Sequence, residues 1–491
     1  MELSHAAGRV AVAPARDATP RIGGVAQPFT DGSELRDPYR DEVVTRVALS
    51  TSEEVRAAVD AALEAQPRIA GMPVHERAAV MRRAADLVEE RAEVYASTIT
   101  RQTGKALKNT LREVRRAAWT MRAAATAAES MRGQVLPGDV APDGEGILAL
   151  TLREPVGVIG AITPFNAPFN LVVHKVAPAF AAGNAIVVKP ANEAPLAALD
   201  VAEVLEEVGA PTGAVNVLPG NRQTIGALVA DQRVGMFTLT GSRAAGEALL
   251  RGAGLRRVVL ELGGNSPNIV HRDAPLAATA AACVRGGFAN TGQSCNSVQR
   301  IIVQRDALDE FTDALLATTA RLVVGDPMDP DTDVGTVVDT VAADRIEEWL
   351  DEAQRRGARL LAGGHRSGAQ LEPIVVVDAP LDSRLVCEEV FGPVVVLLPY
   401  GEVDEAIAKA NATPFGLQAA VFTESLDVAM RVSRGVRSGA VLVNKTTNYR
   451  MDHLPYGGVK ESGFGREGPA SAIEEMTELK LVVIGRADAI S

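Results

Sequence analysis

Cysteine and histidine are scarce in this sequence. Its 491 residues include 3 Cys and 6 His, no two cysteines form a CxxC pair, and the histidines are scattered. Because paired thiols underlie disulfide frameworks and most structural zinc sites, both are excluded and no bound metal is expected. The default compartment is the reducing cytoplasm, and each thiol needs its own explanation.

Excess positive charge and long apolar runs are also missing. There are 50 Lys and Arg against 62 Asp and Glu, a net charge of −12, so no nucleic-acid or anionic membrane surface is expected. No run of about 18 apolar residues occurs, so no membrane span is expected. Residues 1–24 lack the apolar core of a signal peptide, and residues 1–20 are expected to form a disordered tail. Glu2 and Asp17 make a transit peptide the weaker interpretation.

What is present is an ordinary globular composition, with 47% hydrophobic and 23% charged residues, and the length suggests two to four domains. Apolar residues recur at helical spacing over residues 52–65, 74–103 and 107–131. A Gly- and Pro-rich stretch over 135–152, ending in apolar residues, then predicts a hairpin-like arm outside the main body.

From residue 156 onward, short apolar strands alternate with helices. Strands are predicted over 156–162, 185–189, 215–218, 236–240 and 257–262, and helices over 169–182, 195–208, 224–230 and from Ala244. This alternation predicts a parallel sheet with right-handed crossovers. A second α/β stretch follows over 267–465, and a terminal strand is predicted over 479–484.

One cysteine stands in unusual surroundings. A lone cysteine is usually a small core residue. Cys295, however, follows a helical pattern over 276–290 and lies in a polar turn that reads Gly-Gln-Ser, so it is a candidate nucleophile. Cys283 and Cys387 lie in apolar segments and are expected in the core.

A carboxylate and an amide complete the candidate chemistry. Glu261 interrupts an apolar strand, where burial would raise its pKa toward the range of a general base, although an ion pair with Arg256 or Arg257 is the alternative. Asn166 follows the first strand of the alternating series, at the edge where α/β sheets bind ligands. Its amide could donate to an oxyanion, or it could simply form the turn.

These residues belong to motifs that occur in a fixed order. The motifs are TPFNAPFN (163–170), KPA (189–191), FTLTGSRAAG (237–246), ELGG (261–264), GQSC (292–295), EEVFGPV (388–394) and PYGGVKESGFGRE (455–467). Together they resemble the aldehyde dehydrogenase superfamily over essentially the whole chain after the tail, as does the 34-residue separation of Glu261 and Cys295. TPFN, SVQR (297–300) and RMDHLP (450–455) are most similar to its lactaldehyde- and glyceraldehyde-type branch.

The resemblance implies an α/β aldehyde dehydrogenase-like fold. A Rossmann-like NAD(P)-binding domain would comprise residues 21–133 and 153–263, and an α/β catalytic domain residues 264–465. A β oligomerisation arm would comprise residues 134–152 and 475–491. The family uses such an arm to build homodimers or homotetramers, so the expected partners are a second copy of the chain and a small aldehyde.

The resemblance also implies a reaction. The Cys295 thiolate would attack the aldehyde, and the Asn166 amide and the Cys295 backbone N–H would hold the oxyanion of the thiohemiacetal. After hydride transfer, Glu261 would activate the water that hydrolyses the thioester. The alternatives are a CoA-acylating semialdehyde dehydrogenase, disfavoured because such enzymes typically lack this glutamate, and a non-catalytic structural or nucleotide-binding member, disfavoured because all three residues are intact.

The cofactor implied is NAD or NADP, without a metal. The expected contacts, carried over from the family, are Ile162, Thr163, Pro164, Phe165, Lys189, Asn192, Gly226, Thr240, Gly241, Ser242, Leu262, Glu389 and Phe391. NAD-preferring members commonly carry Glu where this chain has Asn192, so a 2′-phosphate is not repelled and the choice of nucleotide stays open. Arg222 could meet that phosphate, but a solvated surface arginine is the alternative.

The substrate tunnel implied by the resemblance is polar. Its expected lining is Arg116, Asn170, His174, Ser294, Asn296 and Tyr449. Buried polar groups need partners, so this lining favours a hydroxyaldehyde, a semialdehyde or a phosphonoaldehyde over an apolar aldehyde. The alternatives are a satisfied core histidine for His174, and for Arg116 a salt bridge with Glu113 or a nearby acid.

Overall fold

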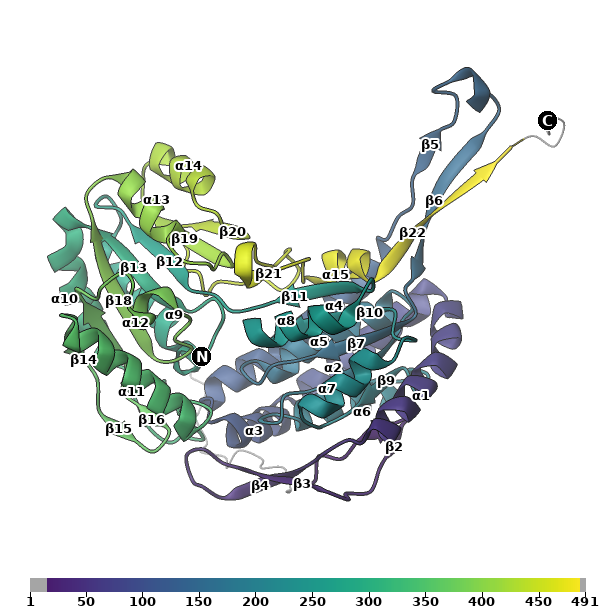
Figure 1. The fold of residues 1–491 in the computed structure, drawn as a ribbon, viewed down its shortest axis with the longest axis horizontal. Coiled ribbons are helices and arrows are strands. Elements are labelled where there is room, and N and C mark those ends of the chain that lie inside the picture. The colour runs from purple at the N-terminus through teal and green to yellow at the C-terminus, as the bar shows by residue number, and fades with distance from the viewer. Residues whose placement is uncertain (1–15, 486–491) are drawn as a thin grey trace, which may run out of the picture.

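The computed structural model of the protein describes residues 16–485 (Figure 1). Residues 1–15 of the expected tail lie outside the described residues. Residues 16–20 are not a loose tail, because Arg16 pairs with Asp200 and Glu203 on a neighbouring helix and Ala18 is fully buried. The expectation of a tail is therefore wrong for these five residues.

A helical layer follows the hairpin of β3 (Gly32–Arg36) and β4 (Val43–Ala48). It consists of α1 (Ser52–Gly71), α2 (Val74–Glu90), α3 (Ala92–Thr103) and α4 (Leu107–Glu129). The single helix expected over 74–103 is in fact two, because the chain leaves the helical conformation at Arg91 (φ −97°, ψ 12°). The other two helices are confirmed, with α1 running six residues further than expected.

The first sheet has the strand order β2-β1-β9-β8-β7-β10-β11-β21. Its parallel strands are β7 (Val158–Ile162), β8 (Ala185–Lys189), β9 (Val215–Val217), β10 (Met236–Thr240) and β11 (Arg257–Glu261). The helices between them are α5 (Pro168–Ala181), α6 (Leu196–Glu207), α7 (Arg222–Ala230) and α8 (Arg243–Ala253). Strands β1 (Arg21–Ile22), β2 (Val25–Ala26) and β21 (Gly463–Phe464) add antiparallel edges.

The chain reverses its direction of travel across this sheet at β7. It runs from β7 outward through β8 and β9, then returns to the other side of β7 for β10 and β11. In open α/β sheets, ligands bind at the carboxyl ends of the strands at such a switch point. The alternation predicted from the sequence is thereby confirmed, and it positions the segments after β7 and β10 for binding.

The second sheet has the order β14-β17-β18-β13-β12-β19-β20. Its strands are β12 (Ser266–Val270), β13 (Val298–Gln304), β14 (Arg359–Ala362), β17 (Ile374–Val377), β18 (Val394–Tyr400), β19 (Gln418–Phe422) and β20 (Ala440–Val443). The helices are α9 (Leu276–Phe288), α10 (Leu308–Thr319), α11 (Thr340–Arg355), α12 (Arg384–Cys387), α13 (Val403–Asn411) and α14 (Leu426–Gly435). A short hairpin, β15 (Arg366–Ser367) with β16 (Gln370–Leu371), lies outside this sheet.

The two sheets have separate apolar cores. One cluster draws its residues from 18–262 together with Ile473 and Met476, and the other two draw theirs from 269–436. Cys283 is fully buried in the second part, as expected, whereas Cys387 is partly exposed at the end of α12. The core position expected for Cys387 is therefore wrong. The exact domain boundaries stay a prediction.

The arm is a small antiparallel sheet that projects from the body (Figure 1). Strand β6 (Leu148–Pro155) pairs with β5 (Val135–Pro137) on one side and with β22 (Thr477–Ile484) on the other. The helix α15 (Pro469–Glu475) leads into β22. Apolar side chains of β22 remain exposed, among them Leu479, Leu481 and Val483. Within residues 16–485, no helix is both long and apolar enough to cross a membrane.

Candidate active site

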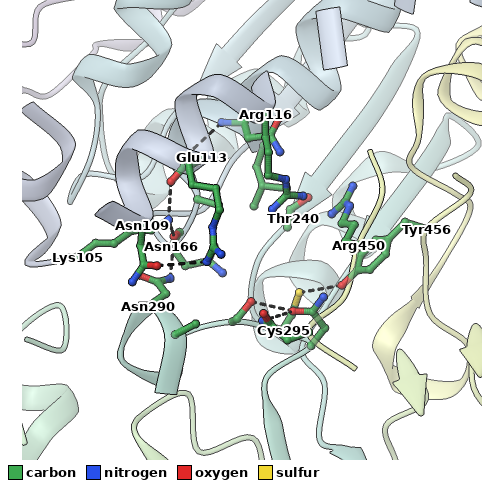
Figure 2. A pocket seen from close by; sticks show the side chains of 18 of the residues that line it. Lys105, Asn109, Glu113, Arg116, Asn166, Thr240, Asn290, Cys295, Arg450 and Tyr456 are labelled. Atoms are coloured by element: carbon green, nitrogen blue, oxygen red, sulfur yellow. Dashed lines mark hydrogen bonds and ion pairs between the residues drawn. The ribbon is translucent and has the colours of Figure 1, made fainter. Parts of the chain in front are cut away.

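A pocket opens where the two sheets approach each other (Figure 2). Helix α4 forms one wall, and the loops after β7, after α9 and before β21 form the rest. The lining is Lys105, Asn109, Arg112, Glu113, Arg116, Asn166, Ala167, Asn170, Leu171, Thr240, Glu261, Ala289, Asn290, Ser294, Cys295, Asn296, Asn448, Arg450, Tyr456 and Glu467. The three residues expected to carry the chemistry therefore share one pocket.

Cys295 lies in the loop between α9 and β13. The loop turns through the 3₁₀ segment η2 (Ala289–Gly292), where Asn290, Thr291 and Gly292 all have positive φ. A Cβ on Gly292 would lie 1.9 Å from the Gly392 carbonyl oxygen, so only glycine fits there. The turn presents Cys295 Sγ to the pocket at 3.2 Å from Tyr456 Oη.

Burial sets the resting state of this thiol. It raises the pKa of Cys295 to about 12, although the hydrogen bond from Tyr456 acts in the opposite direction. The resting side chain is therefore the thiol. The Cys295 backbone N–H makes no hydrogen bond within the described part of the chain, so it is available as a donor at the same loop.

Glu261 ends β11 and points into the pocket. Neither of its carboxylate oxygens has a hydrogen-bond partner among residues 16–485. Burial, and secondly the charge of Glu467, raise the pKa of Glu261 well above its ordinary value. The alternative ion pairs do not form, because Arg256 and Arg257 donate to backbone carbonyl groups instead.

Asn166 is held through its backbone. Its carbonyl oxygen accepts from Lys105 Nζ at 3.1 Å and from Asn290 Nδ2 at 2.9 Å. Its side-chain amide makes no hydrogen bond to another described residue and lines the pocket. This arrangement leaves the amide available to a ligand.

A buried ion pair supports the same loop. Lys105 Nζ lies 2.5 Å from Glu113 Oε2, and Glu113 Oε1 accepts from the backbone N–H groups of Phe169 and Asn170 at 2.8 and 3.2 Å. Glu113 therefore satisfies two of the free N–H groups at the start of α5. Its partner is Lys105 rather than Arg116.

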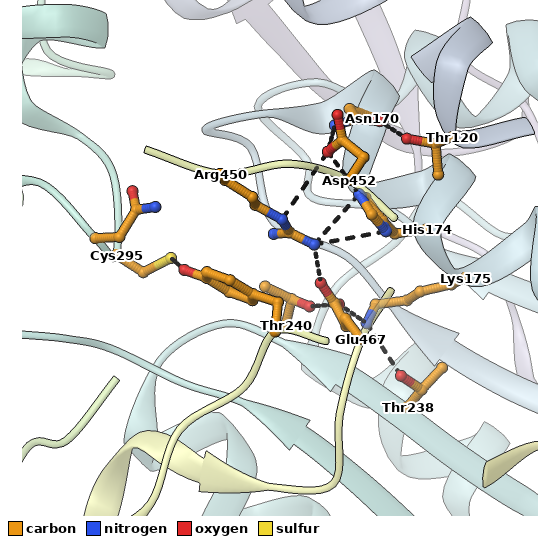
Figure 3. Close-up of polar contacts among 12 residues, drawn as sticks. Thr120, Asn170, His174, Lys175, Thr238, Thr240, Cys295, Arg450, Asp452 and Glu467 are labelled. Atoms are coloured by element: carbon orange, nitrogen blue, oxygen red, sulfur yellow. Dashed lines mark hydrogen bonds and ion pairs between the residues drawn. The ribbon is translucent and has the colours of Figure 1, made fainter. Parts of the chain in front are cut away.

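A second network surrounds Glu467 (Figure 3). Glu467 Oε1 accepts from Lys175 Nζ at 3.0 Å and from Thr240 Oγ1 at 2.9 Å, and Glu467 Oε2 accepts from Arg450 at 3.0 Å. Burial alone would raise the pKa of Glu467, but the charges of Lys175 and Arg450 lower it below its ordinary value. The two carboxyl groups therefore have pKa values shifted in opposite directions, upward for Glu261 and downward for Glu467.

Asp452 interacts with several polar side chains behind the pocket. It accepts from Arg116 through two hydrogen bonds of 3.0 and 2.7 Å, from Asn170 Nδ2 at 3.2 Å, and contacts His174 Nε2 at 3.0 Å. Although its burial acts to raise the pKa, His174 and Arg116 lower the pKa of Asp452. The acid that pairs with Arg116 is therefore Asp452.

The expected substrate residues separate into two groups. Arg116, Asn170, Ser294 and Asn296 line the pocket, but His174 and Tyr449 do not. His174 is fully buried against Asp452 and behaves as a satisfied core histidine, and Tyr449 is 42% exposed beside Lys445. The expected positions of His174 and Tyr449 in the lining are corrected accordingly.

Several pocket residues were not named from the sequence as site residues. Arg450, Tyr456 and Glu467 line the pocket, Asp452 lies behind it, and all four belong to quoted motifs, so their motif membership was the available signal. Arg112 stands one helical turn before Arg116 and shares its face of α4, which the helical period alone indicates. Thr240, expected at the cofactor, lines this pocket, and its contact with the cofactor stays a prediction.

The expected cofactor residues lie beside the switch point. Gly226 and Ser242 line a groove between α7 and α8 together with Arg222, Ile225, Val229, Ala230, Leu239, Ala244, Ala245, Ala248, Leu249, Arg251 and Gly252. Ser242 caps the amino end of α8, whose free N–H groups suit a phosphate. A Cβ on Gly226 would meet open space, so the groove is accessible.

The remaining cofactor residues offer unpaired or neutral polar groups. Thr163 Oγ1 is buried without a partner among the described residues, and Lys189 Nζ donates to Asn192 Oδ1 at 3.3 Å. Glu389 accepts from the Gly264 N–H at 2.8 Å, and burial raises the pKa of Glu389 to about 7. Phe391 meets Phe165 edge to face at 5.8 Å. Ile162 is the last residue of β7, and Leu262 directly follows the last residue of β11. These groups fit a dinucleotide.

The fold and this pair of sites define a class: α/β enzymes with a nucleotide groove at the switch point and a second pocket holding a cysteine. The aldehyde dehydrogenase family model matches residues 27–482. The chain belongs to this family and is an NAD(P)-dependent aldehyde oxidoreductase.

Three individual proteins illustrate which members of the family this chain is similar to. A 3-sulfolactaldehyde dehydrogenase of Priestia aryabhattai is 42% identical over 464 residues, which make up 94% of this chain and 97% of that protein. Aldehyde dehydrogenase 21 from Physcomitrella patens, in complex with the reaction product succinate, matches with a TM-score of 0.94 at 35% identity, covering 97% of this chain and 100% of that chain. An NADP-dependent glyceraldehyde-3-phosphate dehydrogenase from Bacillus halodurans C-125, complexed with NADP, matches with a TM-score of 0.93 at 34% identity, covering 96% and 100%.

Proposed function

We propose that the protein oxidises a small polar aldehyde carrying a negative charge at its far end to the carboxylic acid. The observation that supports this most directly is Arg112. It lines the pocket, its only hydrogen bond within the described chain goes to the neutral Asn109 at 3.2 Å, and no carboxylate pairs with it. Although the side chain of Arg112 is partly exposed, its partial desolvation, and then the like charge of Arg116, lower its pKa. An anion bound there would relieve this repulsion.

Arg116 has a different role in this proposal. Asp452 pairs with its guanidinium group and partly neutralises its positive charge. Arg116 therefore mainly shapes the pocket wall. The charge left over at the pocket's outer wall is that of Arg112. An aldehyde with a sulfonate, carboxylate or phosphate group suits this wall, and such groups occur in the substrates or products named for the three similar proteins.

The proposed chemistry begins at Cys295. Its thiolate attacks the aldehyde carbon, and the resulting oxyanion accepts from the Asn166 amide and the Cys295 backbone N–H, which both lack other partners. A bound nicotinamide would accept hydride, which leaves a thioester on the cysteine. The free donors at this loop support the assignment.

Glu261 is proposed to act in the second half of the reaction. Once ionised, it takes a proton from water, and the water oxygen attacks the thioester carbon. A carboxyl group with a raised pKa is suited to this work because its proton affinity lies closer to neutrality. No other described residue makes a hydrogen bond to either Glu261 oxygen, so neither oxygen is committed to a protein donor.

Either nicotinamide nucleotide is proposed as the cofactor. The neutral Asn192 beside Lys189 does not repel a 2′-phosphate and still offers an amide to ribose hydroxyls. Arg222 lies on the α7–α8 groove, where it can meet such a phosphate. Compartment stays a prediction, with the reducing cytoplasm as the default.

The test is an aldehyde panel followed by NAD(P)H absorbance. Arg112→Gln should lower kcat/KM for succinic semialdehyde or 3-sulfolactaldehyde about ten- to a hundredfold, since a hydrogen bond to a charged group contributes about 1.5–3 kcal/mol, and should leave propanal unchanged. Arg115→Gln, an exposed arginine on the same helix but outside the lining, is the control. Equal losses for charged and neutral aldehydes would contradict the proposal. In the presence of coenzyme A, the product should still be the free acid. This result would distinguish the proposed enzyme from the CoA-acylating alternative.

A further inference from the structure

The hydroxyl group of Tyr456 touches the candidate nucleophile. Tyr456 Oη lies 3.2 Å from Cys295 Sγ, and the tyrosine is almost fully buried (Figure 2). We propose that Tyr456 is a catalytic residue that donates a hydrogen bond to the Cys295 thiolate, both before attack and when the sulfur leaves. This inference rests on the proposed role of Cys295 as nucleophile.

The fold fixes the phenol firmly. Tyr456 and Glu467 exchange two backbone hydrogen bonds of 2.9 and 2.7 Å. The Arg450 guanidinium stacks over the tyrosine ring at 3.9 Å from its centroid and is itself held by Glu467. The next residue, Gly457, passes so close to Glu261 that an added Cβ would lie 2.7 Å from its Oε1. The ring is therefore held from two sides, with its oxygen directed at the sulfur.

The direction of the hydrogen bond follows from the protons available. A thiolate has no proton, so only the phenol can donate when the nucleophile is in its reactive form. Burial, and secondly Cys295, raise the pKa of Tyr456 well above its ordinary value, so the phenol keeps its proton throughout the working range.

The other charged groups near the sulfur mostly oppose the thiolate. Glu389 and Glu261 raise the pKa of Cys295 when ionised, whereas Arg450 lowers it. Glu467 is paired with Lys175 and Arg450, and the cations of α4 lie on the opposite wall. Burial and these two carboxyl groups disfavour the thiolate. The Tyr456 hydroxyl group, which is in direct contact with the sulfur, favours it by donating a hydrogen bond.

The same contact serves the last step of the reaction. Water adds to the thioester carbon and gives its proton to Glu261. The tetrahedral adduct then re-forms its C=O bond while the C–S bond breaks, and the electron pair stays on sulfur. The departing thiolate again accepts from Tyr456, which stays protonated.

The test is the pH dependence of Cys295 alkylation by iodoacetamide, without aldehyde or cofactor. Tyr456→Phe removes one oxygen and keeps the ring under Arg450. A charge-assisted hydrogen bond of the usual strength predicts an upward shift of the alkylation pKa by about 1–2 units, and about ten- to a hundredfold slower alkylation below it. Labelling is read on the Cys295 peptide by mass spectrometry, because Cys387 is partly exposed.

Tyr400→Phe is the matched control, since Tyr400 is equally buried but its hydroxyl has no partner among the described residues. It should leave the alkylation profile unchanged. A Tyr456→Phe profile that coincides with wild type, at an equal thermal midpoint, would overturn the inference. If Tyr456→Phe does not fold, 3-fluorotyrosine at position 456, a stronger donor, should lower the alkylation pKa, and no change would equally overturn it. The proposed function fails separately, if Cys295→Ala retains substantial turnover.

Discussion

Replacing either of two buried glutamates in the pocket with Gln should change the stability of the protein, and the pH dependence of that change should be opposite for the two residues. Glu261 has no hydrogen-bond partner among residues 16–485, and its pKa is raised, first by burial. Glu467 is buried to the same degree, but Lys175 and Arg450 lower its pKa. Replacing either with the isosteric Gln removes a titratable group without changing the shape, so the pair forms an internally controlled experiment.

The stability effects follow from linkage. A carboxyl group whose folded-state pKa is raised contributes its full stabilising free energy below its unfolded pKa of about 4.3. As the pH rises from there to the folded pKa, this stabilisation is lost at about 1.4 kcal/mol per pH unit. Glu261→Gln should therefore become progressively more stable than wild type as the pH rises. Glu467 has a lowered pKa, so its contribution is present above about pH 4.3 and lost on acidification. At neutral pH, Glu467→Gln should cost about 3–5 kcal/mol, because two buried cations lose their shared partner.

The kinetic effects separate the two steps of the reaction. Acylation precedes the water step, so Glu261→Gln should release about one NAD(P)H per active site in a burst and then stall. Loss of a general base lowers a rate by roughly 10²–10⁴, which sets the expected drop in steady-state kcat. Stopped-flow absorbance gives the burst, and differential scanning fluorimetry from pH 6 to 9 gives the thermal midpoints.

Two outcomes would refute this reasoning. If the burst and the steady state fall in proportion, Glu261 activates the thiol rather than water. If Glu261→Gln is destabilised at every pH as strongly as Glu467→Gln, then Glu261 is ionised and paired in the native protein, contrary to its lack of partners.

Two further predictions concern the cofactor and assembly. Asn192→Glu should weaken NADP binding about tenfold or more by repelling the 2′-phosphate while sparing NAD, and fluorescence titration showing equal loss for both nucleotides would remove residue 192 from the ribose site. The exposed apolar residues of β22 suggest that a second copy covers the arm, so light scattering should give a dimer or tetramer for wild type and smaller species for Leu481→Asp. A stable wild-type monomer at micromolar concentration would contradict that prediction.

The parallel strands could be predicted well from the sequence because strands that are buried on both faces consist of unbroken apolar runs. The bounds expected for β8 and β10 coincide with those of the structure. The break at Arg91 between α2 and α3 could not be foreseen, since no Gly or Pro marks it and the apolar period continues through it. Cys387 was misplaced because the apolar Leu385 and Val386 precede it, but the short helix that carries it ends there, before Glu388, and leaves the thiol partly exposed.

Prediction of the site depended on how far apart the interacting residues are in sequence. Cys295, Glu261 and Asn166 each stand in a local pattern, so each was named from its own segment. The Arg116–Asp452 pair joins α4 to a loop more than 300 residues later, and no local pattern indicates that contact. His174 was placed in the lining because its position on α5 is near Asn166, but the helix turns its ring toward Asp452 and away from the pocket.

The protonation states of the pocket were the least predictable feature, and they decide the chemistry. Glu261 and Glu467 both belong to quoted motifs, and nothing in those motifs indicates which carboxyl group has a raised pKa and which a lowered one. The difference arises because Lys175 on α5 and Arg450 in the last loop both reach Glu467, while no cation makes a hydrogen bond to Glu261 within residues 16–485. Glu467, once committed to those cations, also raises the proton affinity of Glu261 through its negative charge. In the proposed reaction, the carboxylate of Glu467 would thus raise the proton affinity of the base Glu261 without moving a proton itself, and this difference between the two glutamates is visible only in the three-dimensional arrangement.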